Sequence, residues 1–173
     1  NAMEEIREAV QLPPIEGADE LYAAYADMVY RLARVRTRSS ADAEDVTSEV
    51  FLRYLKSKPQ LADREHQKAW FLRVTINCSS SLLTSAWRRH LAPEPPDDSR
   101  TPAVEQEDHS DVYEAVLALP GDLRTAIHLF YYEGYSVEEI CAITGAGVSA
   151  VKSRLFRARE QLRRKLRGEY FHV

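Results

Sequence analysis

Apolar side chains recur every three or four residues along most of this chain, which is the spacing of one face of an α-helix. Three such patterns occupy the N-terminal half, at residues 18–36, 42–54 and about 67–89. No stretch alternates apolar and polar residues convincingly in the way that a half-buried strand does. The pattern therefore predicts an all-α fold class.

The second of these patterns predicts a helix with one apolar and one acidic face. Its apolar positions recur every four residues and are expected to face the core: Val46, Val50 and Tyr54. Its acidic positions follow at i, i+3 and i+7: Asp42, Asp45 and Glu49. Carboxylates in a first turn are favoured by the helix dipole, so capping alone would explain the first two acids. It does not explain the third.

The third pattern places aromatic rings beside cations. Trp70 and Phe71 lie close in sequence to Lys68 and Arg73. Such a mixture suits single-stranded nucleic acid, because bases stack on rings while cations hold phosphates. The simpler interpretation places both rings in the protein core, as is usual for large aromatic side chains, and we adopt it for these two.

A second kind of pattern follows near the C-terminus, where two helices flank a glycine turn. Ser136 and Glu139 have the spacing of a capping box, which opens a short helix. Gly145 and Gly147 bracket a tight turn. A longer helix then starts near residue 148 and carries one apolar stripe: Val151, Leu155, Ala158 and Leu162. A helix-turn-helix is therefore predicted.

Charge changes the picture, because it is segregated along the chain. The whole chain has a net charge of −4, but residues 152–173 carry eight Lys and Arg against two Glu. Residues 91–122 carry nine Asp and Glu against one Arg. A merely solvated helix face would interleave Glu with Lys, whereas only Glu160 interrupts the basic run. A basic second helix is the form that enters the DNA major groove, so the sequence predicts DNA binding.

Composition also predicts the domain organisation. Residues 91–111 hold four prolines, many acids and almost no apolar periodicity, which is typical of a flexible linker. Two small helical domains are expected on either side of it, at residues 19–90 and 112–173. Residues 1–18 are expected to form a leader, in which Asn1-Ala2 before Met3 has the form of an expression-tag remnant.

Several classes of protein are disfavoured by the residues that the chain lacks. Cys78 and Cys141 make no metal-ligand pair and are expected to be free thiols, as in a reducing cytoplasm. The histidines are scattered, and the serine triplet at 79–81 has no nearby general base. No apolar run is long enough to insert in a membrane. We expect no catalytic residue, no metal and no cofactor.

Three segments together resemble a known family. They are DAEDVTSEVF at 42–51, AWFLRVTIN at 69–77 and LPGDLRTAIHLFYYEGYSVEEICAITGAGVSAVKSRLFRARE at 119–160, the last two separated by the acidic linker. In this order they resemble the extracytoplasmic-function (ECF) sigma factors, the two-domain bacterial initiation factors of the sigma-70 superfamily. The resemblance covers about residues 20–166. It implies partners: core RNA polymerase through its β′ clamp coiled coil and β flap, promoter DNA, and an anti-sigma factor.

The resemblance also implies the residues of three contact surfaces. The first would dock on the β′ coiled coil: Asp42, Asp45, Ser48, Glu49 and Leu52. The second would hold the promoter's minus-ten element, with a flipped base in the loop at 56–67: Lys58, Arg64, Lys68, Arg73, Asn77, Arg88 and Arg89. The third would read the minus-thirty-five element: Ser149, Lys152, Ser153, Arg154, Phe156 and Arg157.

The chain departs from the family pattern at two places. Ser48 stands where relatives usually have glutamine, and the segments 78–81 and 84–85 replace positions that are commonly Asp and Arg. Fewer cations there leave open a polymerase-binding regulator or helix-turn-helix transcription factor without full promoter-melting activity. A response-regulator factor is disfavoured, because residues 19–90 lack the βα alternation of a receiver domain.

Overall fold

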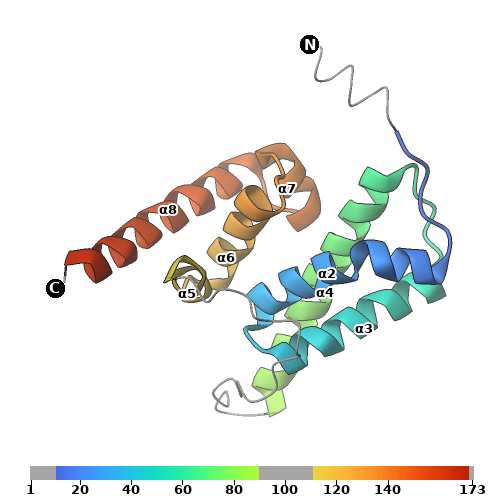
Figure 1. The fold of residues 1–173 in the computed structure, drawn as a ribbon, viewed down its shortest axis with the longest axis horizontal. Helices are drawn as coiled ribbons and strands as arrows, with labels where there is room; N and C mark the ends of the chain where they lie inside the picture. The colour runs from blue at the N-terminus through green and yellow to red at the C-terminus, as the bar shows by residue number, and fades with distance from the viewer. Residues whose placement is uncertain (1–10, 90–110, 172–173) are drawn as a thin grey trace.

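The computed structural model describes the chain at residues 11–89 and 111–171, with side chains at 11–85 and 111–168. The predicted tag remnant and residues 91–110 of the predicted linker lie outside these residues. Within the described parts every regular element is a helix, which confirms the all-α prediction (Figure 1).

Three helices make the N-terminal domain. They are α2 (Ala18–Thr37), α3 (Ser40–Ser57) and α4 (Arg64–Arg89), and they pack pairwise against one another. The turn between α2 and α3 is tight because Arg38 takes a left-handed conformation, with φ 59°, and donates its amide to Arg34. Ser39 then caps α3 by accepting from the Asp42 amide. The helix predicted at 42–54 therefore extends beyond its apolar pattern at both ends, as α3.

The C-terminal domain holds α5 (Asp111–Leu117), α6 (Gly121–Ile127), α7 (Val137–Thr144) and α8 (Val148–Phe171). One π-helical turn, η1 (His128–Tyr132), continues α6. The wider turn was not predicted, since a local change from α to π winding leaves no signature in apolar spacing.

The N-terminal core gathers around Phe71. Its side chain is fully buried, and its ring centroid lies 4.9 Å from Tyr25, 5.1 Å from Phe51 and 4.9 Å from Tyr54. Trp70 packs edge-on against Phe71 but keeps part of its surface exposed. The core interpretation of Phe71 is confirmed, and Trp70 packs at the margin of the same cluster.

A buried glutamine ties this core to the start of the chain. Gln67 accepts from the Tyr25 hydroxyl (3.0 Å) and the Ile15 amide (2.9 Å) through its Oε1. Its Nε2 donates to the Ile15 carbonyl (2.9 Å) and the Tyr54 hydroxyl (2.8 Å). A buried amide is stable only when its hydrogen bonds are made, so Gln67 fixes residues 11–17 against α4.

The two domains do not stand apart in this structure. Helix α2 packs against α6, and α4 packs against α7 (Figure 1). A single cluster of buried apolar side chains contains residues of both domains. The sequence left the relative orientation of the domains open, and the structure brings them into direct contact.

Candidate polymerase and DNA interfaces

The helix-turn-helix is built as its sequence predicts. The Glu139 amide donates to the Ser136 hydroxyl (3.1 Å), and the Ser136 amide donates to the Glu139 carboxylate (3.2 Å), which completes the capping box. Gly145 ends α7 with φ 79° and donates its amide to the Cys141 carbonyl (2.9 Å). A side chain at this φ would be strained, which explains the glycine.

Helix α8 buries one stripe and exposes another. Val151, Leu155 and Ala158 are at most 2% exposed, and they fix the helix against α6 and α7. Five of the predicted minus-thirty-five residues are exposed on the same helix: Ser149, Lys152, Ser153, Phe156 and Arg157.

Phe156 and Arg154 differ in exposure within this surface. Phe156 is 63% exposed, which is unusual for a large apolar side chain with a core close by. Arg154 is half-buried, and its Nη2 lies 3.9 Å from the Asp122 carboxylate at the start of α6. Arg154 is therefore the least available of the six side chains in this conformation.

The acidic face of α3 is open to solvent. Asp45, Ser48 and Glu49 are exposed, and Leu52 is 49% exposed beside them. Asp42 is half-buried, and burial raises the pKa of its carboxyl, with Asp45 adding to the effect and the Ser39 hydrogen bond opposing it.

Glu49 has a partner on its own helix. Its carboxylate accepts from Arg53 Nε at 3.0 Å, one helical turn away. An exposed pair of this kind contributes little to stability. The structure therefore brings the five predicted docking residues together on one helix, with an apolar side chain within an acidic surface.

The predicted minus-ten residues are less uniform. Lys58 ends α3 in a left-handed conformation, and Asn77 is exposed on α4. Arg64 donates through Nε to the Pro13 carbonyl at 3.1 Å. The side chains of Arg88 and Arg89 lie outside the described residues.

Two members of the minus-ten set contact the C-terminal domain and are also partly open to solvent. Arg73 donates through Nη2 to the Ala142 carbonyl of α7 at 3.3 Å. Lys68 Nζ lies over the Tyr135 ring, 5.3 Å from its centroid. The C-terminal domain thus touches the face of α4 that the sequence assigns to promoter DNA, although Arg73 stays exposed there.

A buried carboxylate joins the domains on another side. Glu133 accepts from Arg31 of α2 at 3.4 Å and lies 3.3 Å from His128 Nε2. Burial acts to raise the pKa of Glu133, but His128, Arg31 and Lys68 outweigh it and leave the pKa below its ordinary value. Glu133 is therefore held as a charged group within the contact between the two domains.

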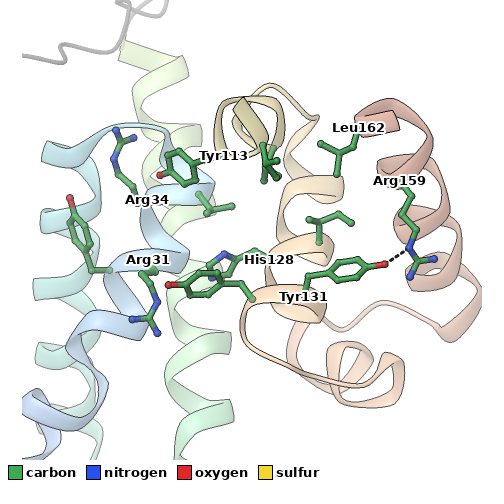
Figure 2. A pocket seen from close by; sticks show the side chains of 13 residues that line it. Arg31, Arg34, Tyr113, His128, Tyr131, Arg159 and Leu162 are labelled. Carbon is green, nitrogen blue, oxygen red and sulfur yellow. Dashed lines mark hydrogen bonds between the residues drawn. The ribbon is translucent and has the colours of Figure 1, made fainter. Parts of the chain in front are cut away.

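An apolar cavity of about 730 Å³ lies between the domains (Figure 2). Arg31 and Arg34 of α2 line one side, while Tyr131 of η1 and Arg159 of α8 line the other. Arg159 donates through Nε to the Tyr131 hydroxyl at 2.6 Å. Since the walls belong to different domains, the cavity exists only while the domains touch.

Other sites are not indicated in the part of the chain that the structure describes. Cys78 is buried and Cys141 half-buried, and both are free; burial raises the pKa of the Cys78 thiol. No group of three or more His, Cys, Asp or Glu side chains there is placed to hold a metal ion. Among the described helices none is long and apolar enough to cross a membrane.

The contacts that sequence reasoning missed are those between the domains. Arg36 of α2 donates to the Thr125 hydroxyl of α6 at 2.8 Å, and a second bond of 2.8 Å, to the Ser80 hydroxyl of α4, holds its side chain within the N-terminal domain. Arg124 of α6 donates to the Val35 carbonyl of α2, also at 2.8 Å. Nothing in apolar periodicity marks an arginine whose partner lies 89 residues away.

Comparison with known proteins matches each half of the chain to a described family region. Residues 21–89 match the family model described as Sigma-70 region 2, and residues 109–162 match Sigma-70, region 4. The chain is 31% identical over 145 residues to the RNA polymerase sigma factor SigV of Bacillus subtilis, covering 81% of this chain and 85% of that protein. It is 36% identical over 154 residues to the ECF RNA polymerase sigma factor SigE of Mycolicibacterium smegmatis, covering 84% of this chain and 60% of that one.

A solved structure shares the fold. It is the sigma factor RpoE of Bartonella quintana in complex with the anti-sigma factor NepR, with a TM-score of 0.71 and 22% identity over 86% of this chain and 96% of that chain. The two region matches, in this order, and the likeness to SigV and SigE show the family. The chain belongs to the extracytoplasmic-function group of the sigma-70 family, the promoter-recognising factors of bacterial transcription initiation.

Proposed function

We propose that this chain binds core RNA polymerase and directs it to promoters through separate minus-thirty-five and minus-ten surfaces. The N-terminal domain at 19–90 acts as sigma region 2 and the C-terminal domain at 112–173 as sigma region 4. The observation that carries the proposal is the exposed face of α8, which joins cations and an exposed aromatic ring on a capped helix-turn-helix.

Helix α8 enters the major groove in this proposal. Lys152 and Arg157 donate to base edges or phosphates, and Phe156 makes apolar contact with a base. The exposed positions farther along α8 add phosphate contacts, because Arg164 and Lys165 point away from the core.

The N-terminal domain supplies the polymerase contact and the opened strand. The acidic face of α3 docks on the β′ clamp coiled coil, with Leu52 as an apolar anchor among the carboxylates. Asn77 and Arg73 of α4, with Lys58 and Arg64, hold the unpaired minus-ten strand. Unpairing a base costs a few kcal/mol, and docking two weak sites on one polymerase offsets it.

The remaining partners follow from the same assignment. Sigma factors are generally not enzymes, and we propose no reaction for this chain. Its place of action is the cytoplasm, where core polymerase transcribes. An anti-sigma factor is a further partner, since the Bartonella quintana relative of this fold was solved with one.

The minus-thirty-five surface is tested by single substitutions. Lys152→Ala and Arg157→Ala are each expected to weaken binding of the polymerase complex to minus-thirty-five duplex DNA by roughly 1–3 kcal/mol if they touch base edges. Both side chains are exposed, so the melting temperature should stay unchanged. Fluorescence anisotropy with matched and base-substituted duplexes measures both the loss and the relaxed specificity.

Glu138→Ala is the matched control, because Glu138 is exposed on α7 and belongs to none of the three surfaces. Its binding should equal that of the parent chain. If Lys152→Ala and Arg157→Ala bind normally and only Arg164→Ala binds weakly, the domain holds phosphates without reading sequence.

A further inference from the structure

An extended segment at the start of the described chain crosses the beginning of α4. We call residues 12–17 the strap, and Figure 1 shows it beside the loop that leads into α4. The Leu12 carbonyl accepts from the Arg64 amide at 3.0 Å. The Pro13 carbonyl accepts from Nε of the same arginine at 3.1 Å. Two consecutive residues of the strap therefore contact the first residue of α4.

Gln67 anchors the strap three residues further along α4. Its side chain is fully buried, and it bonds both the amide and the carbonyl of Ile15, each at 2.9 Å. Paired strands exchange the same two bonds, so the strap is held as firmly as a strand beside its neighbour. The other bonds of the Gln67 side chain go to the hydroxyls of Tyr25 and Tyr54. The position of Ile15 is thus fixed by an amide that the core itself holds in place.

The sequence of the strap limits its own motion. Pro13 and Pro14 fix φ at two successive positions, which leaves few conformations between Leu12 and Ile15. Neither proline has an amide hydrogen, so this part of the strap offers carbonyl acceptors and no donor. A guanidinium is donor-only and needs an acceptor. The Pro13 carbonyl is therefore a fixed acceptor for Arg64.

This contact orients Arg64 without neutralising it. Both partners of Arg64 in the strap are neutral carbonyls, whereas a carboxylate would offset the positive charge. The side chain is exposed, and its bond to Pro13 uses Nε, so Nη1 and Nη2 remain for another acceptor. Holding a side chain in place before binding reduces the entropy that binding removes. A charged, exposed and oriented guanidinium is suited to a phosphate, which it can bind with strong charge-assisted hydrogen bonds.

We propose that the strap, anchored by Gln67, positions Arg64 to bind a backbone phosphate of the unpaired minus-ten strand. The strap makes no DNA contact of its own in this proposal, so Pro13 and Gln67 act as positioning residues. The inference rests on the proposed function of the N-terminal domain, and it adds how one of the cations in that surface is oriented. Polymerase docking on α3 and minus-thirty-five binding on α8 belong to other helices and do not depend on the strap.

The phosphate contact is tested with a fork-junction DNA, double-stranded through minus-thirty-five and single-stranded through minus-ten. Its sequence comes from a promoter enriched from a randomised library by transcription with core polymerase and this chain. Fluorescence anisotropy measures its binding to the complex of the two. Arg64→Gln is expected to weaken binding roughly fivefold and to lower the salt slope by about 0.7, the contribution of one phosphate of a single strand. A duplex that ends upstream of minus-ten should bind every variant equally.

The positioning role is tested by loosening the strap. Pro13→Gly together with Pro14→Gly keeps each carbonyl but frees the backbone, and Gln67→Leu removes both bonds to Ile15. Each change is expected to weaken fork-junction binding roughly threefold in the parent chain and not at all in the Arg64→Gln background, because residues that act through one contact are not additive. A strap that only stabilised the fold would weaken binding alike in both backgrounds.

Tyr25→Phe is the matched control, because it removes one hydrogen bond of Gln67 and leaves both bonds to Ile15. Its binding should equal that of the parent chain. NMR relaxation of the Arg64 Nε–H group gives a second measurement: the strap variants should make this group more mobile, and Tyr25→Phe should not. Circular dichroism melting identifies the variants that are folded at the assay temperature. The glycine pair spares the buried amide, so it supplies the test if Gln67→Leu does not fold.

Different results would contradict the inference and the proposed function. Normal fork-junction binding by Arg64→Gln overturns the phosphate contact. The positioning is overturned if the strap variants bind normally, if they lose the same amount in the Arg64→Gln background, or if the Arg64 Nε–H group stays rigid in them. The proposed function fails on another result, in which core polymerase with the parent chain enriches no promoter, and the inference then fails with it.

Discussion

Replacing Asp45 and Glu49 together by lysine is expected to abolish binding of core RNA polymerase. Both carboxylates are exposed on α3, next to the apolar side chain of Leu52. Reversing two charges in a docking surface turns attraction into repulsion and leaves the apolar contact without its surrounding electrostatic complement. Pull-down of core polymerase on the immobilised chain measures the result, which should fall to background.

The control changes the net charge by the same amount elsewhere. Asp27 of α2 and Glu44 of α3 are exposed and lie outside the predicted docking set. The double variant Asp27→Lys, Glu44→Lys should therefore still capture polymerase. Both double variants should keep the helical circular dichroism spectrum, since exposed substitutions of this kind change stability little. Normal capture by the Asp45, Glu49 variant would show that α3 is not the docking helix.

Phe71→Ala is expected to cause the largest loss of stability. The ring is fully buried and stacks within 5.2 Å of four other aromatic rings, those of Tyr25, Phe51, Tyr54 and Trp70. Removing a buried phenyl ring leaves a cavity and typically lowers the free energy of unfolding by about 3–5 kcal/mol. Urea denaturation followed by circular dichroism measures that change.

Phe156→Ala makes the matched comparison, because it removes the same side chain from a site that is 63% exposed. Its free energy of unfolding should change by less than about 0.5 kcal/mol. It should instead weaken minus-thirty-five binding. A similar loss of stability at both positions would mean that Phe156 packs in the core and that α8 presents another face to DNA.

The helices and their faces were predictable because they depend on local pattern. Val46 and Val50 are buried and Asp45 is exposed, as the spacing of four residues predicts. The capping box at Ser136 and the glycine at position 145 were predictable because helix ends have specific residue requirements. Lys152 and Arg157 could be placed on the exposed face of α8 because the apolar stripe of that helix marks its buried face.

What the sequence did not predict depends on distant partners. Arg73 and Lys68 were expected to face DNA, and their basic character gave no sign that Arg73 would contact α7 or that Lys68 would lie over the Tyr135 ring before it. Arg124 lies in a short apolar helix, where an arginine has no local explanation. Gln67 carries no local sign that it would become the buried junction of three segments. Each of these roles is defined by a contact between residues far apart in sequence.

Polymerase docking bears on DNA binding in the proposed function. The minus-ten and minus-thirty-five surfaces belong to different domains, and promoter elements are read on one DNA molecule. Docking on polymerase would hold each domain at its own site and would join two weak DNA contacts into one stronger one by effective concentration. A free chain should then bind promoter DNA poorly, and more poorly as salt rises.

Permanganate reactivity of promoter thymines tests the central claim most directly. The template is one enriched from a randomised minus-thirty-five and minus-ten library by transcription with core polymerase and this chain. Unpaired thymines near the start site should react only when core polymerase and the chain are both present. The free chain should give neither reactivity nor tight promoter-specific binding. Tight specific binding by the free chain, or an unreactive template with both components, would contradict the assignment as a promoter-recognising initiation factor.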